Sequence, residues 1–95
     1  MKGYWIAHVT VSNPEQYKLY ADAAVSAFQK YKARILARGG RHMQLEGAGR
    51  PRNVVIEFPS FEEAVACYNS PEYQTARVKR KDAGIADIVI VEGTQ

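Results

Sequence analysis

The residues best suited to proton transfer in this chain are a histidine and a glutamate, each placed within an apolar run. Glu57 lies between Ile56 and Phe58, and His8 interrupts a run of aromatic and β-branched residues near the N-terminus. A buried carboxylate is costly unless it is paired. If the two runs are neighbouring strands, both side chains can share a face and serve as a general acid–base pair or as a ligand anchor. The alternative is a pair that only fixes the register of a dimer.

Aromatic and cationic side chains form a second group, which is suited to holding a substrate. Among the tyrosines that recur at helical spacing we name Tyr20 and Tyr68 as ligand-binding candidates, and we add Arg38 because a guanidinium binds a carboxylate or phosphate through two hydrogen bonds. A flat or acidic small molecule would fit a pocket between them. The alternatives are core packing for the tyrosines and capping or solvated charge for the arginines. The other arginines that flank the same region are Arg34, Arg41, Arg50 and Arg52.

Other chemistries find little support in the sequence. Cys67 has no histidine near it and indicates a buried, inert thiol, and the two histidines lack the spacing of a metal site. The basic run over residues 77–81 is short, has acidic neighbours, and is typical of a solvated helix face. No apolar run approaches the roughly 18 residues of a membrane helix. We therefore expect no metal, no cofactor, no nucleic acid and no membrane partner, and a cytoplasmic location.

Length and composition indicate one small globular domain over residues 1–95. Of its 95 residues, 46% are hydrophobic and 24% are charged, and the net charge is +3. These values are ordinary for a globular protein. A chain of this size buries only about 60–65% of its unfolded surface, so self-association would stabilise it.

The elements that must position the candidate residues follow from periodicity and capping. Apolar residues at steps of three and four predict a long helix over Pro14–Arg38, bent near Asp22 and ended by two glycines. The capping box at Ser60 begins a second helical segment, which Ser70 restarts as a helix from Pro71 to about Ala83. A period of two predicts four strands, with Met43 and Leu45 facing inward: Tyr4–Val11, Arg41–Glu46, Asn53–Phe58 and Ile85–Glu92.

This βαββαβ order is typical of the α+β, ferredoxin-like fold, a four-stranded antiparallel sheet with two helices on one face. We expect the first and third strands to be central and parallel to one another. The uncovered face would carry Tyr4, Ile6, Val55 and one set of the residues 88–91. A sheet that faces water should alternate with polar residues, and a large apolar patch is unusual on a monomer. The pattern therefore predicts a homodimer packed sheet to sheet.

Several segments together resemble a bacterial family called domain of unknown function 1330, and the likeness spans essentially the whole chain. The resemblance implies a ferredoxin-like fold, a dimeric α/β-barrel and no established reaction. Relatives in the wider group include cofactor-independent monooxygenases, haem-degrading enzymes and small-molecule isomerases or decarboxylases, which is an analogy of fold. The segments that carry the resemblance are Asn13–Tyr17, Leu36–Gly40, Leu45–Gly47, Arg52–Ser60 and Tyr68–Tyr73.

Three functional hypotheses follow. The first is a dimeric, cofactor-independent enzyme acting on a small acidic or aromatic metabolite, in which His8 and Glu57 transfer protons while Tyr20, Arg38 and Tyr68 position the substrate. The second is a non-catalytic ligand-binding or regulatory dimer that uses the same pocket. The third is a structural interaction module. Turnover that is lost in Glu57→Gln would favour the first, and a bound small molecule without turnover would favour the second.

Overall fold

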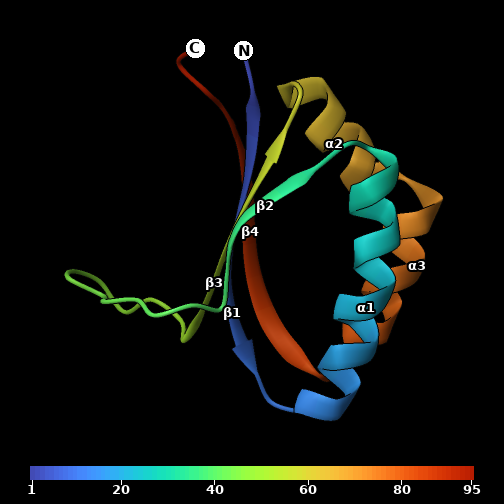
Figure 1. Cartoon of the computed structure of the whole chain (residues 1–95). Helices are drawn as coiled ribbons and strands as arrows, with labels where there is room; N and C mark the ends of the chain where they lie inside the picture. The colour runs from blue at the N-terminus through green and yellow to red at the C-terminus, as the bar shows by residue number, and fades with distance from the viewer.

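The computed structural model describes residues 1–95 and places four strands on one side of the molecule and three helices on the other (Figure 1). Two of the helices follow one another as a broken second helical segment, so the order is βαββαβ. The predicted α+β, ferredoxin-like fold is confirmed. The elements are β1 (Gly3–Val11), α1 (Pro14–Lys30), β2 (Arg34–Arg38), β3 (Arg52–Phe58), α2 (Phe61–Asn69), α3 (Pro71–Arg80) and β4 (Gly84–Glu92).

The sheet is antiparallel at every pairing, in the order β2-β3-β1-β4. The first and third strands are central, as predicted, but the prediction that they run parallel is wrong. The crossover through α1 brings β2 back in the direction of β1, and the chain then reverses between β2 and β3. As a result β3 runs antiparallel to both.

The end of α1 and the position of the second strand differ from the prediction. The helix ends at Lys30, not at Arg38, and Lys32 has a positive φ of 59° that turns the chain. Arg34–Arg38 then pairs with β3 as the edge strand β2. The apolar spacing around Ile35 fits a helix locally, but pairing satisfies the backbone hydrogen bonds along the free edge of β3, and this tertiary gain outweighs the local preference.

Residues 39–51 form a loop, so the predicted strand Arg41–Glu46 is absent. Figure 1 shows this loop projecting from the sheet on the side away from the helices. Met43 and Leu45, predicted to face inward, are each 81% exposed. Glycines with positive φ bend the loop without steric cost, and they are Gly39, Gly47 and Gly49.

The core lies between the helices and the inner face of the sheet. Trp5 on the central strand β1 is at its centre, and its ring lies 5.3 Å from Phe28 of α1, 6.0 Å from Phe58 of β3 and 4.9 Å from Tyr73 of α3, centroid to centroid. One side chain therefore joins four elements. Burying a side chain of this kind stabilises a fold by about 1.5–3 kcal/mol.

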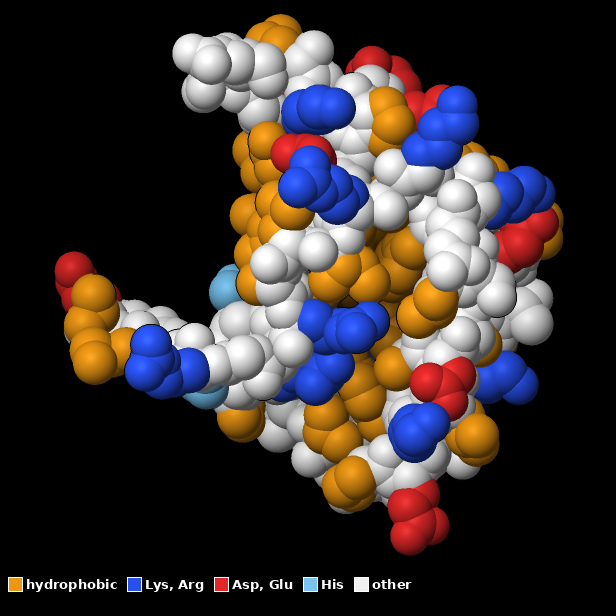
Figure 2. Space-filling view, viewed as in Figure 1, with side chains coloured by type: hydrophobic (Ala, Val, Ile, Leu, Met, Phe, Trp, Pro, Cys, Tyr) orange, Lys and Arg blue, Asp and Glu red, His pale blue; other side chains and the backbone are white.

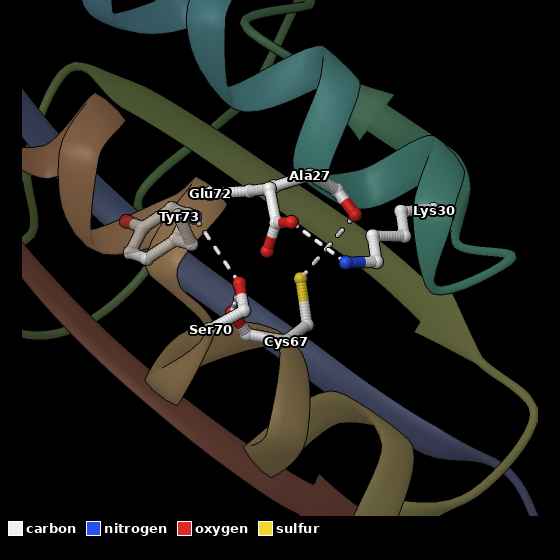
Figure 3. A network of polar contacts seen from close by, with 6 residues as sticks. All are labelled: Ala27, Lys30, Cys67, Ser70, Glu72 and Tyr73. Atoms are coloured by element: carbon white, nitrogen blue, oxygen red, sulfur yellow. Dashed lines mark hydrogen bonds and ion pairs between the residues drawn. The ribbon is translucent and has the colours of Figure 1, made fainter.

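Polar contacts fix the three helices to one another (Figure 3). The Ser70 hydroxyl accepts a hydrogen bond from the Tyr73 amide at 3.1 Å and donates one to the carbonyl of Cys67 at 2.7 Å, so it caps α3 and ties it to the end of α2. Lys30 at the end of α1 donates to Glu72 in the first turn of α3 at 2.6 Å. The restart that the sequence predicts at Ser70 is confirmed, and it orients α3 against α1.

The outer face of the sheet, which we call the open face, has no helix over it. The register of β1 with β3 and β4 places on this face the apolar residues predicted there: Tyr4, Ile6, Val55, Val89 and Val91. Val89 and Val91 are 54% and 47% exposed. The protein therefore has one buried and one unpartnered apolar face.

Candidate functional site

A cavity lies between α1 and the inner face of the sheet. Seventeen residues line it, of which 14 are hydrophobic, and the volume open to the centre of a water molecule is about 50 Å³. Trp5 and Ile56 form part of its floor, and Tyr17, Tyr20 and Ala24 of α1 form its wall. Figure 2 shows this hollow between sheet and helix, with hydrophobic side chains inside it and positively charged side chains across it. Apolar clefts with a few polar groups are the usual form of a small-molecule site.

Three arginines line this otherwise apolar cavity, Arg38 from β2, Arg52 from β3 and Arg80 from α3, and no Asp or Glu lines it. All three ion pairs of the chain involve other residues. An unpaired guanidinium beside apolar surface is costly, and an anionic group is its natural partner. The cavity therefore combines an apolar lining with uncompensated positive charge.

Arg52 packs against Tyr17 and has a buried donor without an acceptor. It lies opposite Val9 in the register of β3 with β1, on the inner face of the sheet. Its guanidinium carbon lies 5.5 Å from the centre of the Tyr17 ring, a cation–π contact. Its Nε is buried and has no hydrogen-bond acceptor. Buried polar groups normally have a partner, so this nitrogen is a candidate donor to a ligand.

Arg80 belongs to a second polar set, at the α3 side of the cavity. Its Nη1 donates to the Tyr73 hydroxyl at 3.2 Å, and its guanidinium carbon lies 4.9 Å from the centre of the Tyr20 ring. The hydroxyls of Tyr20 and Tyr73 share a buried hydrogen bond of 2.8 Å. Burial raises the pKa of both tyrosines. The two phenols therefore remain protonated at neutral pH and act as hydrogen-bonding groups.

The structure brings two of the three predicted ligand-binding residues together. Tyr20 and Arg38 both line the cavity. Tyr68 does not, because it lies on α2, where its ring packs 5.7 Å from Trp5 and 5.3 Å from Tyr73. It lines a shallower groove along β4, and that groove shares Arg80, Ala86 and Ile88 with the cavity.

Arg80 is the cavity residue that the sequence analysis missed. In the sequence it belongs to the basic run over residues 77–81, which predicts a solvated helix face. The available signal was helical spacing, because Tyr73, Ala76 and Arg80 follow one another at steps of three and four, and the first two are fully buried. Arg80 therefore lies on the inner stripe of α3, while Arg77 and Lys79 are exposed.

His8 and Glu57 share the open face, as the parity of their strands predicts, but they do not form a pair. His8 lies opposite Asn53, and its Nδ1 is 2.6 Å from the Asn53 Oδ1. Glu57 lies opposite Tyr4 and accepts a hydrogen bond from the Tyr4 hydroxyl at 3.1 Å. Four residues of strand separate the two sites, which is roughly 13 Å. Both sites are on the opposite side of the sheet from the cavity.

Cys67 is a buried structural residue. Its side chain has no exposed surface, and its Sγ lies 3.8 Å from the carbonyl oxygen of Ala27, a contact between α2 and α1 (Figure 3). Burial raises the pKa of the thiol to about 12. The thiol is therefore protonated at neutral pH, and a protonated thiol is a poor nucleophile.

Two further properties concern the whole chain. No group of three or more His, Cys, Asp or Glu residues is arranged so that it would hold a metal ion. None of the helices combines the length with the hydrophobicity that crossing a bilayer requires.

Comparison with known proteins identifies relatives of the sequence and of the fold. A family profile described as "Domain of unknown function (DUF1330)" matches residues 2–94. No curated protein matches significantly.

Solved structures share the fold at low sequence identity. A protein of unknown function from Rhodopseudomonas palustris has a TM-score of 0.72 at 17% identity, over 99% of this chain and 83% of that one. SnoaB, a cofactor-independent oxygenase from Streptomyces nogalater, has a TM-score of 0.70 at 6% identity, over 99% and 94%. A dimeric protein of unknown function and ferredoxin-like fold from Bacteroides fragilis has a TM-score of 0.57 at 14% identity, over 97% and 96%.

Proposed function

The chain belongs to the DUF1330 family, and from this premise and the geometry of the cavity we propose that it is a cytoplasmic homodimer that binds a small acidic or aromatic metabolite between α1 and the sheet. The observation that carries the proposal is the composition of the cavity, in which 14 of 17 lining residues are hydrophobic and three arginines supply the charge. Apolar walls hold a flat molecule, and the polar groups orient it. Tyr20 and Arg38 have the positioning role predicted for them.

Turnover of the bound metabolite without a cofactor is the second candidate function. It is favoured by the shared fold with SnoaB, itself described as a cofactor-independent oxygenase. Binding ranks first because no His, Asp, Glu or Cys lines the cavity, so no general base with a pKa near neutrality is present there.

His8 and Glu57 take a different role in this proposal from the one their sequence suggested. Each already has a hydrogen-bond partner on the open face, and neither lines the cavity. We assign them to the contact between two copies, where satisfied polar pairs within an apolar surface help to fix the register. The fold neighbour from Bacteroides fragilis, which is described as dimeric, supports a two-copy assembly.

The test is a thermal-shift screen with small aromatic acids, in which a ligand raises the melting temperature by mass action. Ala21→Phe places a large side chain at a residue that lines the cavity, and Ser26→Phe makes the same addition at an exposed position of the same helix outside it. We expect stabilisation by ligand in the wild type and in Ser26→Phe, and none in Ala21→Phe. Stabilisation that persists in Ala21→Phe would place the ligand elsewhere and contradict the proposal.

A further inference from the structure

The head group of the ligand can be deduced from the arginines at the β2–β3 side of the cavity. We infer that this site binds a planar carboxylate attached to an apolar body, held between the guanidinium groups of Arg52 and Arg38. The inference rests on the proposed function and goes further, because it names the chemical class of the ligand and the residues that select it.

The first step concerns the charge on neighbouring strands. Arg38 lies opposite Val54 in the register of β2 with β3, and Arg52 is two residues from Val54 on the same face. The two arginines are therefore diagonal cross-strand neighbours, close enough for long side chains to interact. Two like charges at such positions repel one another. Neither side chain makes a hydrogen bond or an ion pair within the protein, so an anion between them would remove the repulsion.

The second step concerns the geometry of Arg52. Its ring contact with Tyr17 and its close approach to Gly39 fix the guanidinium from two sides. Gly39 lies against Nη1, since a Cβ added at that glycine would be 2.5 Å from this atom. The buried Nε, which has no acceptor, is at the other end of the group. Nε and the adjacent Nη2 form the fork that binds both oxygens of one carboxylate.

The third step concerns the kind of anion. The remaining lining is hydrophobic apart from Arg80 and contains no lysine. A free inorganic anion would lose its water there without gaining enough donors in return. A carboxylate on an aromatic or aliphatic body places its charge on the arginines and its carbon atoms against Trp5, Ile56 and α1. The lining and the charge therefore select the same class of molecule.

The experiment compares 2-naphthoate, its uncharged analogue 2-naphthamide and inorganic phosphate, titrated into the purified full chain by calorimetry and by NMR of the arginine Nε–H signals. We expect 2-naphthoate to bind at least about tenfold more tightly than the amide, and the Arg52 Nε–H signal to shift only with the acid. Arg52→Gln and Arg38→Gln should each remove this preference of the site for the acid over the amide. Arg41→Gln removes the same charge from an exposed position of the 39–51 loop and should keep the preference.

The outcomes distinguish a failure of the carboxylate inference from a failure of the proposed cavity site. Equal affinity for acid and amide would overturn the carboxylate and leave the proposed apolar site intact, whereas binding of neither would overturn both. Phosphate that binds as tightly as 2-naphthoate, or a preference that Arg41→Gln also removes, would show a general electrostatic effect and overturn the inference. Arg38 is exposed, so Arg38→Gln tests the claim even if Arg52→Gln does not fold.

Discussion

At the scale of single residues, Gly39 has two structural roles. Its φ of 64° is a left-handed conformation that costs other residues about 1–2 kcal/mol, and its missing Cβ leaves room for the Arg52 guanidinium. We expect Gly39→Ala to lower the free energy of unfolding by about 1–2 kcal/mol and to weaken binding of 2-naphthoate, because Arg52 must move. Urea denaturation and calorimetry measure the two effects.

Gly40→Ala is the matched control for this prediction. No atom lies within 4 Å of a Cβ added there, and the φ of Gly40 is not in the left-handed region. The control should leave both stability and binding close to those of the wild type. Equal effects of the two substitutions would mean that any side chain in this segment disturbs the loop, and would contradict the specific role of Gly39.

Tyr73 illustrates the cost of a broken buried hydrogen bond. Its hydroxyl bonds to the Tyr20 hydroxyl at 2.8 Å and accepts from Arg80 at 3.2 Å. Tyr73→Phe leaves the buried Tyr20 hydroxyl and the part-buried Arg80 Nη1 without this partner, so we expect a loss of about 1–3 kcal/mol in the free energy of unfolding. Tyr68→Phe removes a hydroxyl that makes no hydrogen bond in the structure and should cost far less. Urea denaturation measures both variants. If Tyr73→Phe and Tyr68→Phe lower the free energy of unfolding by similar amounts, the hydrogen bonds of the Tyr73 hydroxyl contribute little to stability.

The candidate residues show how far a sequence can predict a site. Tyr20 and Arg38, chosen for their chemistry, both line the cavity, although Arg38 lies on a strand and not at the end of a helix. For His8 and Glu57, the alternation of side chains predicts the shared face, but a face does not determine the register. Register depends on the connections and on packing across the sheet, which a single strand does not encode. The two residues consequently share a face without meeting.

At the scale of elements, the boundary between α1 and β2 is where local signals mislead. Apolar residues spaced by four, at Tyr31 and Ile35, fit one more turn of helix, and the first glycine comes only at residue 39. The chain instead turns at Lys32, a residue type that rarely adopts a positive φ. The long-range pairing of β2 with β3 decides the outcome. By contrast, the Ser60 and Ser70 caps are local signals and were predicted correctly.

The contact between α1 and α3 has a pH dependence that can be worked out from Glu72. The hydrogen bond from Lys30 lowers the pKa of this carboxyl below its ordinary value of 4.5. A carboxyl whose pKa is lower in the folded state stabilises the protein at pH values above its unfolded pKa, and this stability is lost as the pH falls through the folded pKa. We expect the wild-type free energy of unfolding to fall below about pH 4.5 more steeply than that of Glu72→Gln.

The control for this prediction is Asp22→Asn, which breaks the exposed pair of Asp22 with Lys18 within α1. Asp22 joins no second element, so the slope below pH 5 should stay close to that of the wild type. Urea denaturation at a series of pH values gives the slopes. If Glu72→Gln follows the wild-type curve, the pair does not contribute to the packing of α1 on α3.

At the scale of the whole molecule, the two faces of the sheet are in different situations. Helices cover the inner face, and the cavity lies on that side. The open face presents apolar residues of three strands to the solvent, with Val89 and Val91 about half exposed. The 39–51 loop projects on the same side with Met43 and Leu45 uncovered (Figure 1). This distribution is unusual for a monomer and is the basis of the proposed dimer through the open face.

A substitution on the open face tests this assembly and the independence of the cavity together. Light scattering of the wild type should give twice the chain mass of 10.6 kDa, and Val89→Asp should give the single mass because it places a charge within the apolar surface. Val78→Asp is the control, since Val78 is 71% exposed on α3, away from that face. A wild-type protein with the mass of one chain would contradict the dimer.

Ligand binding by the Val89→Asp monomer then shows whether one copy is sufficient for the site. Val89 is not among the residues that line the cavity, and it lies on the other face of the sheet. We therefore expect 2-naphthoate to bind the monomer with an affinity close to that of the wild type, measured by calorimetry at the same protein concentration. Circular dichroism shows whether the Val89→Asp monomer is folded. If the folded monomer does not bind 2-naphthoate, the second copy shapes the cavity. It could do so because the inner and outer faces of the sheet share the same strands.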